Sequence, residues 1–92
     1  MPGERPRYRV VIDRDARRVL KRCPPDLVRR LMTASMALAD NPRPPGCKKL
    51  RSPNELWRVR VGDWRIVYEI QDDVLVVVVV EVSPRGGAYR KL

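Results

Sequence analysis

Three arginines could form an anion-binding site on a predicted β-hairpin. Apolar and other side chains alternate on both sides of Gly62-Asp63, a pair of residues typical of a two-residue hairpin turn. Folding the chain there would place Arg60 opposite Arg65 and bring Arg58 to the same face, because side chains alternate along a strand. Directly opposed like charges destabilise a sheet. Three arginines on one face therefore predict a site for a polyanion.

The charge of the chain favours an anionic partner. The formal net charge is +9, from 20 Lys and Arg against 11 Asp and Glu. Such a balance suits nucleic acid, an anionic surface or an acidic protein. Sixteen of the cations are arginine, whose guanidinium binds phosphate through two hydrogen bonds but does not readily release its proton. A GC-rich coding sequence would also raise the arginine total, but it would not gather arginines on one strand face.

Length and composition exclude several classes of protein. Ninety-two residues predict one domain, residues 1–92. No apolar run reaches the ~20 residues that span a bilayer, and no signal-peptide region follows Met1, so we expect a soluble, cytoplasmic protein without a membrane partner. Cys23 and Cys47 lack metal-ligand spacing, and the chain has no histidine. We therefore expect reduced thiols, no metal site and no cofactor.

The pattern along the chain predicts an α+β domain in the order β-α-α-β-β-β, with two N-terminal helices packed on one small antiparallel-rich β-sheet. The predicted strands are 8–12, a hairpin within 55–70, and 74–82, and the predicted helices are 14–22 and 26–39. Run 74–82 is apolar at both phases of the alternation, which predicts a strand covered on both faces. Ser83-Pro84 should end that strand.

The arrangement of these pieces resembles the RelE/ParE toxins of bacterial type II toxin–antitoxin systems over nearly the whole chain. The resemblance is carried by Lys-Lys-Leu at 48–50, by the hairpin Trp57-Arg-Val-Arg-Val-Gly-Asp-Trp-Arg-Ile-Val-Tyr68, and by the tail Val82-Ser-Pro-Arg-Gly-Gly-Ala-Tyr-Arg90. For RelE-type members, it implies cleavage of mRNA in the A site of the ribosome. The expected activity is therefore that of a ribosome-dependent endoribonuclease, an mRNA interferase.

The resemblance also implies site residues. Carried over residue by residue, the catalytic group is Arg58, Arg60, Arg65, Arg85 and Tyr89. Other basic residues would contact RNA or the ribosome: Lys48, Lys49, Arg51, Arg90 and Lys91. The reaction needs cations that stabilise a phosphorane-like transition state, a base for the 2′-OH proton and an acid for the 5′ oxygen.

The proton acceptor stays open, because the chain departs from the family at two places. Arginine stands where many relatives have lysine on the strand, and Ser83-Pro84 stands where several have histidine. Arginine, with a pKa of about 12.5 or higher, is a poor general base. The remaining candidates are Lys48, Lys49, Lys91, Tyr89, Glu69 and the ribosomal RNA. Glu69 could instead serve as an ionic partner of an arginine.

Two other functions remain as alternatives. A ParE-type toxin would poison DNA gyrase without cutting RNA, and a third possibility is a catalytically inactive nucleic-acid-binding relative. The resemblance further implies a cognate antitoxin as partner, and binding of operator DNA by the toxin–antitoxin complex. The arginines of the predicted helices are expected to be solvated, with contact to a nucleic-acid backbone as the alternative: Arg17, Arg18, Arg22, Arg29 and Arg30.

Overall fold

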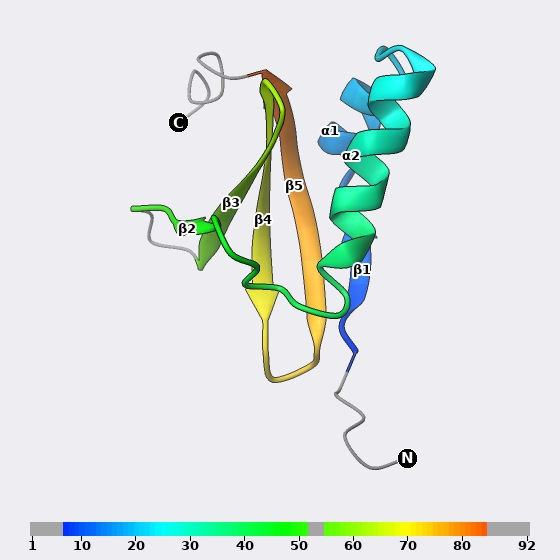
Figure 1. Cartoon of the computed structure of the whole chain (residues 1–92). Coiled ribbons are helices and arrows are strands. Elements are labelled where there is room, and N and C mark those ends of the chain that lie inside the picture. Colours follow the sequence, from blue (N-terminus) through cyan, green and yellow to red (C-terminus); the bar gives the residue numbers. More distant parts are fainter. Residues whose placement is uncertain (1–6, 52–54, 85–92) are drawn as a thin grey trace.

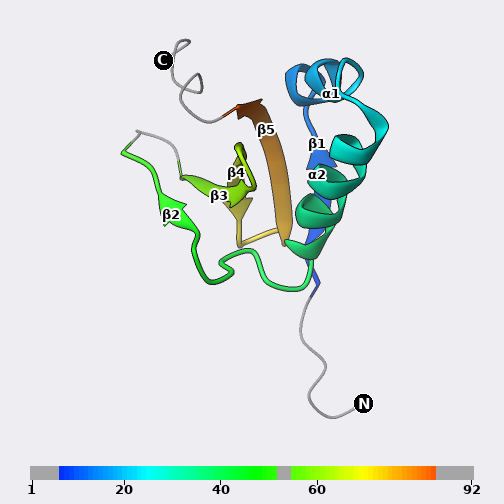
Figure 2. The ribbon, with the colours of Figure 1, turned by 45° about the horizontal axis from the view of Figure 1, so that its top comes forward.

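Two helices and a five-stranded mixed sheet form the part of the chain that the computed structural model describes, residues 7–51 and 55–84. The strands are β1 (Arg9–Ile12), β2 (Lys48–Lys49), β3 (Leu56–Val61), β4 (Trp64–Gln71) and β5 (Val76–Pro84), and the helices are α1 (Arg14–Leu20) and α2 (Pro25–Ala37). Both helices lie on one side of the sheet (Figure 1, Figure 2). The predicted α+β class is confirmed. Neither described helix has the length and apolar character needed to cross a membrane.

The strands are ordered β1-β5-β4-β3-β2 across the sheet. Three pairings are antiparallel and the fourth, between β1 and β5, is parallel. The antiparallel-rich prediction is therefore confirmed, and the sheet gains β2, a two-residue strand on β3 that the sequence did not predict. The parallel pairing joins the first and last strands, so that β5 is paired along both edges.

Both helices differ from the prediction at their ends. Helix α2 runs from Pro25 to Ala37 instead of 26–39. Helix α1 ends at Leu20 rather than Arg22, because the chain tightens ahead of Pro24. The N–H groups of Arg22 and Cys23 bond to carbonyls three residues earlier, at 3.0 and 3.1 Å, as at many helix ends. Helix α2 begins at Pro25, which suits a first helical position because it lacks an N–H group.

The hairpin has the predicted register. Its opposed pairs include Arg58 with Val67, Val59 with Ile66, Arg60 with Arg65, and Val61 with Trp64. Gly62 has a φ of +60°, as the first central residue of a type II′ turn requires. A Cβ atom on Gly62 would collide with the guanidinium of Arg30 on α2. The exposed Arg30 side chain could move aside, so glycine is favoured at this turn by its backbone conformation.

The valine-rich strand is not covered on both faces, contrary to the prediction. Val77 and Val79 are fully buried in the core beneath the helices. Val76 and Val78, which alternate with them, are only half-buried. The prediction failed because both helices pack on the same face of the sheet. The strand also begins at Val76 rather than Val74 and continues through Ser83 and Pro84 instead of ending before them.

A β-bulge interrupts the pairing of β4 with β5. Tyr68 lies opposite Val79 whereas Val67 lies opposite Glu81, so Val80 is an extra residue on β5. Unbroken alternation would send Glu81 to the helix side of the sheet along with Val79. The bulge instead turns Val82 toward the core and places Glu81 on the sheet face away from the helices, termed here the open face.

A polar cluster fastens the loop after α2 to the far end of the sheet. Arg43 donates to both carboxylate oxygens of Asp72, at 3.3 and 2.8 Å, and its guanidinium lies 5.1 Å from the centre of the Trp57 ring. The Tyr8 hydroxyl donates to the same carboxylate at 2.6 Å. Beneath them, the buried Tyr68 hydroxyl donates to the Pro42 carbonyl at 2.8 Å, and burial raises the pKa of Tyr68.

Replacing Asp72 with Asn should make stability less dependent on acidic pH. Hydrogen bonds from Arg43 and then Tyr8 lower the pKa of the Asp72 carboxyl below its ordinary value. A lowered pKa in the folded state contributes stability above the ordinary value of about 4, and this stability is lost as the pH falls through the lowered pKa. The melting temperatures of parent and variant should therefore differ at pH 7 and converge toward pH 2.

The matched control is Asp73→Asn, which changes an exposed neighbour in the same turn. Thermal melts followed by circular dichroism between pH 2 and 7 make the comparison. If Asp72→Asn and Asp73→Asn gave the same dependence on pH, the cluster would contribute nothing to acid stability.

Candidate anion-binding site

Four cations gather on the open face of the sheet, and together they are termed the basic face. Lys48 lies opposite Arg58 across β2 and β3, and Arg60 lies opposite Arg65 across β3 and β4. Cross-strand partners project to the same side of a sheet, as do alternate residues of one strand. The basic face therefore contains two directly opposed pairs of like charge, each of which lowers the stability of the sheet.

Two of these guanidinium groups belong to buried residues. Arg58 is 8% exposed and Arg65 is 7% exposed, whereas Arg60 is exposed. Within the described residues, the Arg58 side chain forms neither a hydrogen bond nor an ion pair. No nitrogen of Arg58 is both fully buried and unpaired, so its charge is partly desolvated but still reaches the surface. An anion bound there would interact with it more strongly than with a fully solvated arginine.

Two carboxylates share this face. Glu69 lies opposite Leu56, as the predicted alternation requires. Glu81 lies opposite Val67, the residue that also faces Arg58, and its Oε2 accepts a hydrogen bond of 2.9 Å from the Ser83 hydroxyl. Sequence reasoning missed Glu81 because regular alternation assigns it to the core. A charged residue in a predicted core phase was the one available signal of a bulge.

The remaining predicted contact residues separate into different places. Lys49 lies opposite Trp57, away from the basic face, and its Nζ is 3.2 Å from the Glu55 carboxylate. Arg51 is exposed after β2. Four further predicted residues lie outside the described ranges: Arg85, Tyr89, Arg90 and Lys91. The structure thus brings together Lys48 and the three hairpin arginines.

The two cysteines, Cys23 and Cys47, are free thiols in separate parts of the fold. No three metal-ligating side chains cluster anywhere in residues 7–51 and 55–84.

The family follows from a comparison of the chain with known proteins. A family model for the ParE toxin of type II toxin–antitoxin systems, parDE, matches residues 10–89. The chain belongs to this family. The toxin is also 29% identical over 87 residues to a protein described as putative toxin RelE1 of Methanocaldococcus jannaschii, a match that covers 91% of the toxin and 97% of that relative.

Solved structures show the same fold. The RelE–RelB complex of Pyrococcus horikoshii contains a chain 29% identical to the toxin, with a TM-score of 0.76, over 88% of the toxin and 98% of that chain. In the RelBE2 toxin–antitoxin complex of Mycobacterium tuberculosis, the matching chain is 28% identical with a TM-score of 0.76, over 86% and 99% of the two chains. The isolated RelE toxin of E. coli, at 20% identity and a TM-score of 0.73 over 89% and 88%, shares the fold. The RelE/ParE resemblance is confirmed.

Proposed function

We propose that the toxin is an mRNA interferase that cleaves mRNA in the A site of the ribosome, with the basic face as its phosphate-binding site. The observation that carries this proposal is that Arg58 is 8% exposed and has no ion-pair partner among residues 7–51 and 55–84. A cation held in such a position is poised for an anionic ligand, and its interaction with that ligand is strengthened where water is scarce. A solvated surface arginine would have neither property.

The chemistry follows from the groups on the open face. In the proposed reaction the 2′ oxygen of a nucleotide attacks the adjacent phosphorus and the bond to the 5′ oxygen breaks. The proton of the 2′-OH passes to a base, and the leaving 5′ oxygen takes up a proton. Guanidinium groups bind the non-bridging oxygens in a fork, and they stabilise the extra negative charge that develops in the transition state. Arg58, Arg60 and Arg65 would fill this role.

The proposed site includes further residues. Arg85 and Tyr89 would complete it from the tail, and Lys48, Lys49, Arg51, Arg90 and Lys91 would contact RNA or the ribosome. Among the described residues of the open face, the groups able to accept a proton are Glu69, Glu81 and Lys48. Either carboxylate could serve as the base in a chain that lacks histidine.

A cognate antitoxin is the proposed protein partner. The structures from P. horikoshii and M. tuberculosis are complexes of toxin with antitoxin. An antitoxin rich in acidic groups would complement the net charge of +9. The pair would also bind operator DNA, and a toxin that acts on ribosomes would do so in the cytoplasm.

Poisoning of DNA gyrase is the second candidate function. The match of residues 10–89 to a family model of ParE toxins favours it. The buried Arg58 favours the nuclease, because a phosphate ligand would compensate its charge.

Toeprinting of mRNA on translating ribosomes, after brief induction of the toxin, tests the proposal. Cuts within the A-site codon that require the ribosome are the expected result, and purified mRNA without ribosomes is the control. Intact mRNA together with double-strand breaks that depend on gyrase would overturn the proposal in favour of the second candidate. Absence of both effects would contradict both functions.

A further inference from the structure

Helix α1 carries a second group of cations on the other side of the sheet from the basic face. Its apolar residues Ala16, Val19 and Leu20 pack against the core. Four exposed cations occupy the opposite side of the helix and its C-cap, Lys21, and are termed the α1 cation row: Arg14, Arg17, Arg18 and Lys21. Because α1 packs on the helix side of the sheet (Figure 1), this row and the basic face cannot grip the same phosphate.

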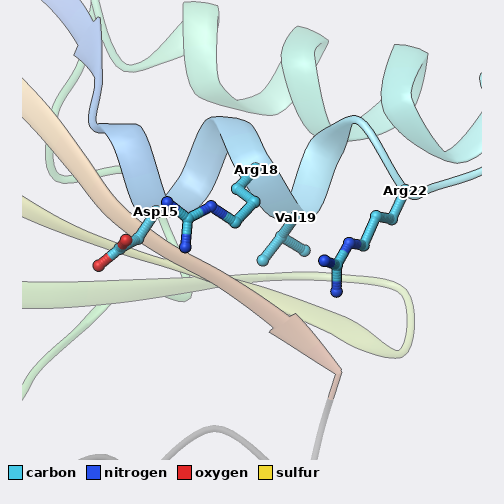
Figure 3. A pocket seen from close by; sticks show the side chains of 4 residues that line it. All are labelled: Asp15, Arg18, Val19 and Arg22. Carbon is cyan, nitrogen blue, oxygen red and sulfur yellow. The ribbon is translucent and has the colours of Figure 1, made fainter.

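The α1 cation row borders two hollows in the surface. All described residues that line the first, of ≈ 370 Å³, belong to the row. The second, of ≈ 260 Å³, is lined by Asp15, Arg18, Val19 and Arg22. Their side chains project from α1 and the turn that follows it (Figure 3). Asp15 offsets one charge there, so two cations face one anion. Both hollows therefore favour an anionic occupant.

Helix stability does not explain the row. No side chain of the row forms an ion pair or hydrogen bond within the described part of the chain. Arg14 with Arg18, and Arg17 with Lys21, are like charges four residues apart, and each such pair costs a helix about 0.2–0.5 kcal/mol. The helix dipole favours Arg17 and Arg18 in the last turn, but it disfavours Arg14 in the first turn.

We propose that the α1 cation row binds the phosphate backbone of a double-helical RNA segment, separate from the strand held by the basic face. From Arg14 to Lys21 the helix rises ~10 Å. In double-helical DNA one strand carries a phosphate every ~3.4 Å along the axis, and at a similar spacing in an RNA duplex about three phosphates could lie along the row. Three of the four cations are arginines, whose forks suit phosphate oxygens. The choice of RNA rests on the proposed function.

The test measures binding of a 20-base-pair RNA duplex, 2′-O-methylated so that it cannot be cleaved, at several salt concentrations. The variant Arg14→Gln/Arg17→Gln/Lys21→Gln removes three charges from the row, and glutamine has a similar helix propensity. The slope of log K against log salt should become shallower by about 0.9 for each phosphate that the variant no longer binds, and the affinity should fall about tenfold or more. Arg14→Lys/Arg17→Lys, which keeps the charges, should keep the slope.

The control Arg7→Gln/Arg9→Gln/Arg29→Gln removes the same number of charges elsewhere, and it should retain most of the affinity. Equal reductions of affinity in the two triple variants would overturn the proposal, because net charge alone would then explain binding. Unchanged affinity of the α1 triple variant for the RNA duplex would also overturn it. So would tighter binding of a DNA duplex than of the RNA duplex by the parent protein. A third contrary result would be a loss of affinity for an acidic protein partner with no loss of affinity for RNA.

Two further measurements keep the result interpretable. Thermal melts establish that the variants fold. If the triple variant fails to fold, Arg14→Gln alone should reduce the slope by about 0.9, and an unchanged slope would overturn the proposal. The binding assay contains no ribosome and no cleavable RNA, so its failure is distinct from failure of the toeprinting experiment.

Discussion

Replacing Arg65 with Ala should abolish growth arrest and lower A-site cleavage by about 10²-fold to 10³-fold, the usual effect of removing one preorganised group that stabilises transition-state charge. Arg65 is 7% exposed and lies opposite Arg60 at the centre of the basic face. Its removal would leave the phosphate with fewer donors at the moment when negative charge develops. Cleavage is measured by toeprinting, and growth arrest by colony counts after induction.

Two further variants make this result specific. Arg65→Lys keeps the charge but loses the planar fork, so it should also cleave more slowly than the parent. Arg29 is an exposed arginine on α2 whose guanidinium lies 3.5 Å from the Asp26 carboxylate. Arg29→Ala should leave cleavage unchanged. Full toxicity of Arg65→Ala, in a protein with the parent's melting temperature, would remove Arg65 from the site.

Replacing Val79 with Asp should unfold the domain. Val79 is fully buried between the helices and the sheet. Burying a carboxylate without a partner costs several kcal/mol, whereas the whole stability of a small domain is about 5–15 kcal/mol. Urea unfolding followed by circular dichroism should show no cooperative transition for this variant, or a midpoint far below that of the parent.

The matched control for this variant is Val76→Asp, on the same strand. Val76 is half-buried and lies opposite Arg9 on β1 and Gln71 on β4, so a carboxylate there has a cation opposite it and access to water. We expect this variant to change stability by about 1 kcal/mol or less. Cooperative unfolding of Val79→Asp at the parent's midpoint would show that the core side of β5 is wrongly assigned.

The hairpin was predictable because its determinants are local. Gly62 sets the turn, and strict alternation on either side then fixes which residues oppose one another. The gathering of Arg58, Arg60 and Arg65 on one face follows from that register alone. Burial of Arg58 and Arg65 did not follow, because the exposure of a side chain depends on tertiary packing, which the alternation along a hairpin does not determine.

The valine-rich strand shows what local pattern cannot supply. Its residues are apolar at every position from Val74 to Val80, so they do not indicate which face the helices cover. The parallel pairing with β1 joins residues more than sixty positions apart, and no turn motif signals such a contact. The predicted end of α1 lay two residues too late, because backbone hydrogen bonds of Arg22 and Cys23 form a tighter helical turn directly after α1.

The bulge at Val80 makes β5 unequally tolerant of insertions and deletions. Deleting a valine before the bulge would substitute one aliphatic side chain for another in the core. Deleting Val80 itself would remove the bulge and leave Glu81 opposite Val67 and Val82 opposite Ile66, so both residues would keep their faces of the sheet. Lineages of this toxin should therefore vary in length between the start of the strand and the bulge, and keep the number of residues after it unchanged.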